Sequence, residues 1–239
     1  MTLKLGIAKN NMKVSVVIPA AGLGTRMGGI KKPYVDIAGK PILAYTLGAF
    51  QRCPFIDGIV IVTAKGDESR CIQDVVKTYG IDKPFSVVIG GDTRQESVFN
   101  ALRELSSNTD IVVIHDAVRP LVTEDMIIQS IDGAKQYGSA IVAVPVKDTI
   151  KESDDDGFVA KTLDRRKLWA IQTPQTFKYD LILKAHLYAR DNNIQATDDA
   201  FLVEQMGQKV KLIMGSYENI KITTPDDLAV AKAILESRL

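Results

Sequence analysis

The stretch VSVVIPAAGLGTRMGG, residues 14–29, decides the fold. It begins with Val14–Pro19, a β-branched and continuously apolar run that is typical of a strand buried on both faces of a parallel sheet. A glycine-rich turn with one arginine follows, and Lys31 and Lys32 stand just beyond it. Backbone N–H groups and cations gathered at the end of a strand are suited to hold a polyphosphate. The stretch therefore predicts an α/β domain with a phosphate-binding loop.

Strand-like and helix-like segments alternate along the rest of the chain, which indicates a mostly parallel sheet flanked by helices. We expect a Rossmann-like α/β fold in a single domain over residues 1–239. The expected strands are Val14–Pro19, Ile59–Thr63, Phe85–Ile89, Ile111–Ile114, Ser139–Val146, Val210–Met214 and Ile220–Thr223. The expected helices are residues 41–52, 67–79, 93–105, 124–137 and 226–238, with two more after Lys178.

Residues 147–170 interrupt this alternation. Two polar stretches of strand length, residues 148–153 and 158–166, flank the acidic turn at residues 154–157, which ends in glycine. Such a turn between two strand-like runs indicates a hairpin. The runs carry too few apolar residues to belong to a core. We expect a protruding β-hairpin arm that serves dimerisation; a solvated excursion without a role is the alternative.

Composition narrows the class of protein. Thirty Lys and Arg residues against 29 Asp and Glu residues leave a formal charge of +1, which argues against a nucleic-acid-binding protein. Cys53 and Cys71 lack metal-ligand spacing, and we expect two reduced, buried thiols. No apolar run approaches the ~20 residues that span a membrane, and no signal-peptide pattern opens the chain. We expect a cytoplasmic protein without membrane contact.

The phosphate loop fits neither of the two commonest glycine motifs. Gly24 and Gly29 have the Walker A spacing, but Ile30 stands where that motif needs lysine. Gly22 and Gly24 match the dinucleotide fingerprint, but Met27 replaces its third glycine. A P-loop is excluded, and a dinucleotide-dependent oxidoreductase becomes a weaker alternative.

The pattern that remains, AAGLGTRMG at residues 20–28 and KKPY at residues 31–34, resembles nucleotidyltransferases that join a nucleoside triphosphate to a sugar or polyol phosphate. Further blocks follow in order at residues 90–98, 115–120, 147–151, 163–165, 172–177, 197–200 and 219–223. Together they resemble the 2-C-methyl-D-erythritol 4-phosphate cytidylyltransferase family from about Val14 to the C-terminus. The resemblance implies transfer of CMP from CTP to methylerythritol phosphate, with Mg²⁺ or another divalent cation, in isoprenoid precursor synthesis.

The resemblance also implies roles for residues of the loop. The residues that would contact the nucleotide are Ala20, Ala21, Gly22 and Gly24. Arg26 and Lys32 would stabilise the charge that develops on the phosphates. Lys32 is preferred over Lys31 because the family pattern, lysine and then an aromatic residue two positions on, matches residues 32–34.

Downstream blocks supply the remaining expected site. The positions around the cytosine and ribose are Gly91, Arg94 and Ser97, and Asp116 matches the acidic residue near the ribose and the magnesium. The positions around the methylerythritol phosphate are Arg119, Thr149, Arg165, Thr197 and Lys221. Arg165 and Lys221 are expected to orient this substrate and to act in catalysis with Arg26 and Lys32. Because the family arm crosses to the neighbouring subunit of a homodimer, Thr149 and Arg165 would serve the partner's site.

Such a reaction needs no general base, because a phosphate monoester is already largely dianionic at neutral pH. We accordingly expect His115 to be a hydrogen-bonded structural residue and His186 to lie on the surface. Two alternatives stay open. One is a cytidylyltransferase that acts on another polyol phosphate, such as ribitol 5-phosphate. The other is a silent nucleotide-binding regulatory module, which predicts loss of the cations that this chain retains.

Overall fold

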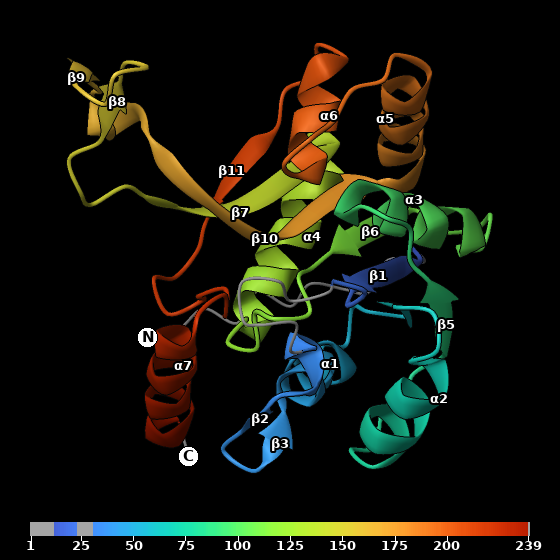
Figure 1. The fold of residues 1–239 in the computed structure, drawn as a ribbon. Coiled ribbons are helices and arrows are strands. Elements are labelled where there is room, and N and C mark those ends of the chain that lie inside the picture. Colours follow the sequence, from blue (N-terminus) through green and yellow to red (C-terminus); the bar gives the residue numbers. More distant parts are fainter. Residues whose placement is uncertain (1–11, 23–30, 239) are drawn as a thin grey trace, which may run out of the picture.

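The structure, a computed structural model, describes residues 12–22 and 31–238. In this part of the chain, seven strands form one sheet in the order β11-β7-β10-β6-β1-β4-β5 (Figure 1). The strands are β1 (Val14–Pro19), β4 (Gly58–Thr63), β5 (Phe85–Ile89), β6 (Ile111–Ile114), β7 (Ser139–Pro145), β10 (Trp169–Lys178) and β11 (Lys211–Met214). Neighbours pair in parallel except at β10, which is antiparallel to β6 and β7. The expected mostly parallel α/β fold is confirmed.

Helices cover both faces of the sheet because its central strands are apolar on both faces (Figure 1). On β1, Val16 and Ile18 face one core and Val17 faces the other, all with no exposed surface. The first core takes side chains from α1 (Ile42–Arg52), the π-helix η3 (Cys71–Lys77) and α4 (Glu124–Tyr137). The second takes them from α3 (Arg94–Glu104), α5 (Tyr179–Asp191) and α6 (Asp199–Gln205). The short α2 (Glu68–Arg70) leads into η3.

One expected strand is wrong and one strand was missed. Residues 220–223 form no strand; they run as a loop into α7 (Pro225–Ser237), tied by the Ile222 N–H to the Val118 carbonyl at 2.9 Å. The missed strand, β10, carries polar residues and Pro174, which argue against a central strand. Its polar side chains are nevertheless satisfied inside the fold: Thr176 donates to Ser130 Oγ at 2.8 Å, for example. The pairing of β10 with β7 is irregular between Ile171 and Gln175, around this proline.

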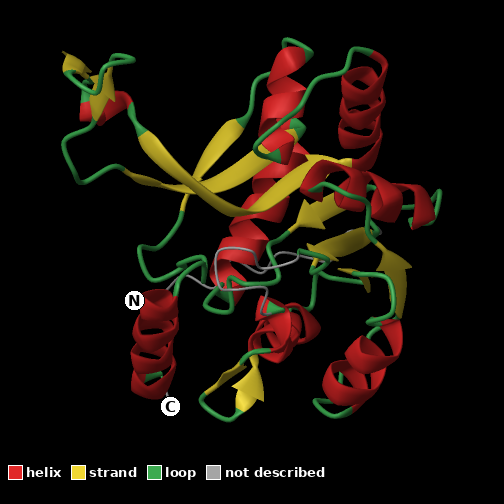
Figure 2. Cartoon of the chain, viewed as in Figure 1, coloured by secondary structure: helices red, strands yellow, loops and turns green. Residues whose placement is uncertain are grey.

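The hairpin arm projects from the body of the fold (Figure 2). Its strands β8 (Lys151–Ser153) and β9 (Val159–Thr162) pair antiparallel, and every residue in both is exposed. Trp169, near the end of the expected 147–170 arm, already belongs to β10. A smaller hairpin joins β2 (Asp36–Ile37) to β3 (Lys40–Pro41). In the part of the chain that the structure describes, no helix is both long enough and apolar enough to cross a membrane.

His115, the residue after β6, joins β6 to β10 through a chain of hydrogen bonds. The Asp116 N–H donates to Thr173 Oγ1 at 3.1 Å, and this oxygen lies 2.9 Å from His115 Nδ1. His115 Nε2 lies 3.0 Å from the Arg119 carbonyl, which only accepts, so Nε2 carries the proton and Nδ1 accepts from Thr173. The histidine has no exposed surface, and burial lowers its pKa to about 4. The expected structural role of His115 is confirmed.

Stability should therefore fall as the pH drops from about 6.5 to about 4. In this window the unfolded chain binds a proton at His115 that the folded chain excludes, since the folded pKa lies below the unfolded value. The loss attributable to His115 should reach about 3 kcal/mol. Chemical unfolding at pH 7 and pH 4.5 measures it. His115→Asn should flatten the decline; an equally steep decline in His115→Asn would contradict the assignment.

Candidate functional site

A cavity of about 630 Å³ opens at the carboxyl ends of the parallel strands β1, β4, β5 and β6. This edge is where open α/β sheets bind their ligands, because the loops that leave neighbouring strands diverge there. The lining comes from the loops after these strands, from the 3₁₀-helix η2 (Lys32–Tyr34), from the start of α3 and from Lys221 in the loop before α7. The sequence-distant blocks are thus brought to one place by the topology of the sheet.

A smaller cavity of about 270 Å³ adjoins the first. Its own lining comes from β10 and from the segment before α6, including Gln172, Thr173 and Thr197. Arg94, Asp116 and Lys221 line both cavities. The two cavities therefore form one composite site with a common wall of charged side chains.

The Gly90-Gly91 turn after β5 lets backbone approach the larger cavity closely. A Cβ atom at Gly90 would lie 2.6 Å from Ala21 Cβ and 2.7 Å from Ser97 Oγ, and one at Gly91 would meet the Cβ of Glu96. Only glycine fits at either position. Ser97 Oγ accepts from the Gly91 N–H at 3.2 Å, which joins the turn to the first turns of α3. The resulting rigid corner offers main-chain polar groups to a ligand.

Asp116 organises the cations of the common wall. Its Oδ1 lies 3.3 Å from Arg94 Nε, and its Oδ2 lies 3.4 Å from Arg119 Nε and 3.0 Å from Lys221 Nζ. Burial alone would raise the pKa of this carboxyl, but Arg94, Lys221 and Arg119 hold it well below its usual range. Asp116 is therefore ionised and keeps cations from three separate segments side by side.

Arg94 contacts a second buried carboxylate. Its Nη1 lies 2.7 Å from Oδ2 of Asp199, which is 1% exposed. Burial alone would lower the pKa of the Arg94 guanidinium, but Asp199 and Asp116 raise it above its ordinary value. Burial would raise the pKa of the Asp199 carboxyl, but Arg94 and His186 together lower it below its ordinary value. Both groups are thus charged in the folded protein.

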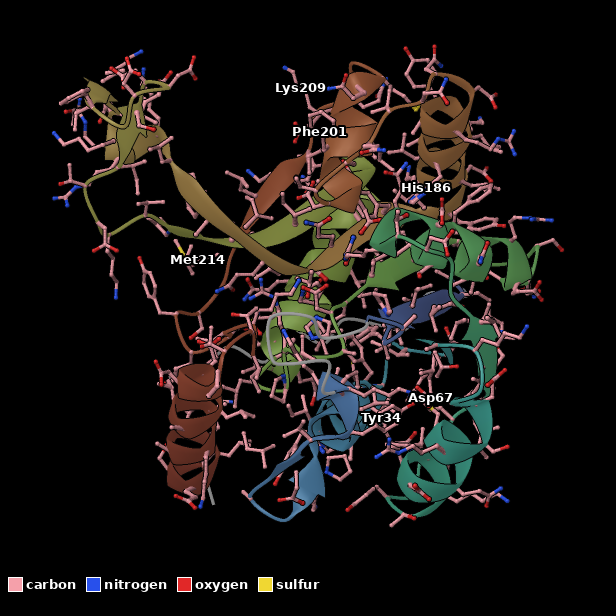
Figure 3. The ribbon with its side chains drawn as sticks, viewed as in Figure 1. Tyr34, Asp67, His186, Phe201, Lys209 and Met214 are labelled. Atoms are coloured by element: carbon pink, nitrogen blue, oxygen red, sulfur yellow. The ribbon has the colours of Figure 1, made fainter. Side chains whose placement is uncertain are left out.

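Lys31 and Lys32 point to different partners. Lys31 Nζ forms a 2.6 Å salt bridge with Asp67, beside the ring of Tyr34 on which the Arg70 guanidinium stacks at 4.3 Å (Figure 3). Lys32 lines the larger cavity, and its Nζ donates to the Thr223 carbonyl at 3.1 Å. Lys32 therefore faces the site from the same side as Lys221.

The turn that carries Lys221 and Thr223 is held by the start of α7. Asp227 Oδ2 accepts from the Thr223 N–H, the Thr223 hydroxyl and the Thr224 N–H at 2.7–2.8 Å. These hydrogen bonds lower the Asp227 pKa, against burial, to about 2. The start of α7 therefore holds residues 220–223, which had been expected to form a strand, in place as a loop.

Most of the residues expected in the site line one of the two cavities. Those at the larger cavity are Ala20, Ala21, Gly22, Lys32, Gly91, Arg94, Ser97, Asp116 and Lys221, and those at the smaller cavity include Arg119 and Thr197. Thr149 and Arg165 line neither: both are exposed, and Arg165 Nη1 donates to the Lys147 carbonyl at 2.6 Å. Gly24 and Arg26 lie outside the described residues.

The sequence interpretation missed Asp199 and misplaced His186. His186 is 2% exposed rather than on the surface; its Nε2 lies 3.3 Å from Asp199 Oδ1, and its ring stacks on Phe99 at 5.9 Å (Figure 3). The signal was present in the helical spacing, because His186 falls on the same face of α5 as the buried Ile182 and Ala189. Asp199 gave no signal beyond its place in the block at residues 197–200.

The composite site can hold two anionic ligands against one another. Arg94 and Lys221 reach both cavities, and of the two carboxylates that pair with Arg94, Asp116 lines the cavities whereas Asp199 lies behind them. Across the same described residues, no group of three or more His, Cys, Asp or Glu side chains could hold a metal ion unaided. A divalent cation would therefore take most of its ligands from a phosphate ligand and water, as Mg²⁺ commonly does.

Comparison with known proteins identifies the family. The family described as 2-C-methyl-D-erythritol 4-phosphate cytidylyltransferase matches residues 14–237. Proteins of that name from Desulforamulus reducens and Caldanaerobacter subterraneus are 51% and 49% identical to this chain; each match covers 94% of the chain and 97% or 99% of the relative. The crystal structure of 4-diphosphocytidyl-2C-methyl-D-erythritol synthase from Anaerococcus prevotii has a TM-score of 0.85 at 35% identity, covering 94% of this chain and 96% of the other. The chain belongs to the 2-C-methyl-D-erythritol 4-phosphate cytidylyltransferase family.

Proposed function

We propose that this protein transfers the CMP moiety of CTP to 2-C-methyl-D-erythritol 4-phosphate, releasing pyrophosphate. Family membership over residues 14–237 supports the reaction. The observation that carries the proposal in the site itself is the pair of adjoining cavities that share Arg94, Asp116 and Lys221. Two anionic substrates that must react with each other need such a common cationic wall.

CTP fits the larger cavity. The Gly90-Gly91 corner and Ser97 offer the close polar groups that discrimination of a pyrimidine edge requires. Lys32 and the loop that starts at Ala20 supply charge and backbone N–H groups to the triphosphate. Arg26 is assigned to the same phosphates by family resemblance. The acceptor phosphate fits the smaller cavity, which Arg119 and Thr197 line.

The chemistry requires alignment and charge neutralisation rather than proton abstraction. The acceptor phosphate is already largely dianionic at neutral pH and attacks the α-phosphorus without a base. The buried, neutral His115, with both ring nitrogens in hydrogen bonds, is consistent with this. Lys32 and Lys221 neutralise the charge that spreads to the departing pyrophosphate. Lys221 lines both cavities and Lys32 lines the larger one, an arrangement that brings the two anions within reach of each other.

Mg²⁺ would act here as a partner of the triphosphate. Asp116, the ionised carboxylate of the common wall, is the protein group suited to contact it or one of its waters. Lys221, now paired with Asp116, would turn to the phosphates, because these carry more negative charge. When bound, the metal would supply further neutralisation of the triphosphate charge.

The arm completes the site in a homodimer. Thr149 and Arg165 are assigned to the acceptor phosphate by family resemblance, yet in one copy they are exposed on the arm and line neither cavity. The arm tip also exposes apolar surface, with Phe158 73% and Val159 63% accessible. An arm that reaches the neighbouring subunit would account for both observations.

Pyrophosphate release tests the reaction directly. With CTP, Mg²⁺ and methylerythritol phosphate the protein should release pyrophosphate steadily, whereas UTP or ATP in place of CTP should support far less. Ribitol 5-phosphate is the matched control for the acceptor. Robust turnover with ribitol 5-phosphate and none with methylerythritol phosphate would transfer the assignment to the alternative cytidylyltransferase.

Adjacent lysines should behave differently. Lys32→Ala should lower kcat about 100-fold or more, because it removes a cation that stabilises the developing charge. Lys31→Ala should leave kcat nearly unchanged and cost about 1 kcal/mol of stability, because the Lys31 side chain is 44% exposed although its partner Asp67 is buried. Steady-state kinetics and thermal unfolding of the pair measure this. The reverse order of kcat losses would refute the assignment of Lys32.

Mixing two impaired variants tests whether the arm acts in the partner's site. Lys221→Ala disables a subunit's own site, and Arg165→Ala disables the arm that it lends. After subunit exchange, half of the dimers should be mixed and each should hold one complete site, restoring about a quarter of wild-type activity. If the arm served its own subunit, the mixture would stay as inactive as the separate variants.

A further inference from the structure

Asp199 lies behind the common wall of the site. Its Oδ2 is 2.7 Å from Arg94 Nη1, yet Asp199 lines neither cavity and is 1% exposed. Arg94 lines both cavities, and its Nε faces Asp116 at 3.3 Å. The guanidinium is thus held at two different nitrogens by two carboxylates. Such a two-point hold fixes the plane of the group as well as its position.

Asp199 is itself held rigidly. The N–H groups of Asp199 and Ala200 donate to Gln175 Oε1 at 3.1 Å each, which ties the start of α6 to β10. Gln175 Nε2 donates to Asp198 Oδ2 at 2.8 Å from the same side chain. His186 covers the remaining oxygen of Asp199 from α5, with its Nε2 3.3 Å from Oδ1. Asp199 is thus enclosed by groups from α5 and β10.

The charges explain why a second carboxylate is needed. Asp116 is already shared among Arg94, Arg119 and Lys221. Without Asp199, the guanidinium of Arg94 would have one anchor, at Nε, and would turn about it toward Asp116 or toward solvent. Arginine has many rotamers, so an unanchored side chain pays entropy each time it binds a ligand. A fixed one is ready in place for both ligands.

We propose that Asp199 is a positioning residue that holds the Arg94 guanidinium in the wall between the two cavities, so that it contacts the nucleotide and the acceptor phosphate together. The inference rests on the proposed function, because it requires two anionic substrates on either side of Arg94. In this arrangement, contacts from α5, α6 and β10 orient the guanidinium of Arg94, which belongs to α3. Asp199 acts through Arg94 and touches neither substrate.

Removing the charge of Asp199 should impair the use of both substrates. Asp199→Asn and Asp199→Ser should each lower kcat/KM for CTP and for methylerythritol phosphate about tenfold or more, the scale of a lost charge-assisted hydrogen bond. Asp191→Asn is the matched control, since this aspartate is exposed at the end of α5 and pairs with Arg190. The control should keep wild-type kinetics. Thermal unfolding of each variant shows which remain folded.

A double-variant cycle separates positioning from a merely structural role. If Asp199 acts through Arg94, then Asp199→Asn should change kcat/KM less than twofold in an Arg94→Gln background. Additive losses would overturn the proposal, as would folded Asp199 variants with wild-type kinetics. Loss of folding in both Asp199 variants would also overturn it, by making Asp199 a stability residue. Wild-type protein in the same assay separates these outcomes from failure of the proposed function, which would appear as absent CTP-dependent pyrophosphate release.

Discussion

The site depends on one buried carboxylate that is paired with cations from distant parts of the chain. Asp116 follows β6, whereas Arg94 begins α3 and Lys221 precedes α7, and all three meet at the carboxyl edge of the sheet. A buried aspartate without these partners would carry a large desolvation cost, and the cations without it would repel one another. The arrangement is stable only as a set. Assembly of this charged wall therefore requires correct packing of α3, α7 and the strand β6.

The apolar residues of the strands support this wall by fixing where the loops leave the sheet. Val16 of β1 pairs with Ile59 of β4 and with Val113 of β6, and none of the three is more than 1% exposed. Close packing on both faces leaves these strands little freedom to slide. The polar strand β10 is different, since its glutamine and threonine side chains reach outward to hold Asp116 and the start of α6. The apolar core fixes the positions of the strands, and β10 fixes Asp116 and the start of α6 by hydrogen bonds.

Sequence patterns predicted the frame well because apolar periodicity reports burial directly. Val14–Pro19 and Phe85–Ile89 have the bounds expected of them. The strand β10 was missed because its polar residues are satisfied by partners far away in the chain, which no local pattern records. For the same reason no local pattern indicated the role of Asp199, and His186 was expected on the surface. The expected strand at residues 220–223 was wrong because Ile222 is buried by a loop that Asp227 holds, not by a ladder. Residues whose environment is built by distant segments are those that a single sequence places least well.

The common wall limits how the two substrate preferences can diverge. A change at Arg94 or Lys221 alters both cavities, so under the proposed function neither residue could adapt to a new acceptor without disturbing the nucleotide. Substrate choice can vary freely only where a residue faces one cavity alone, as Ser97 does on one side and Gln172 on the other. Changes in substrate preference are therefore confined to residues that line one cavity, while the common wall of Arg94, Asp116 and Lys221 stays fixed.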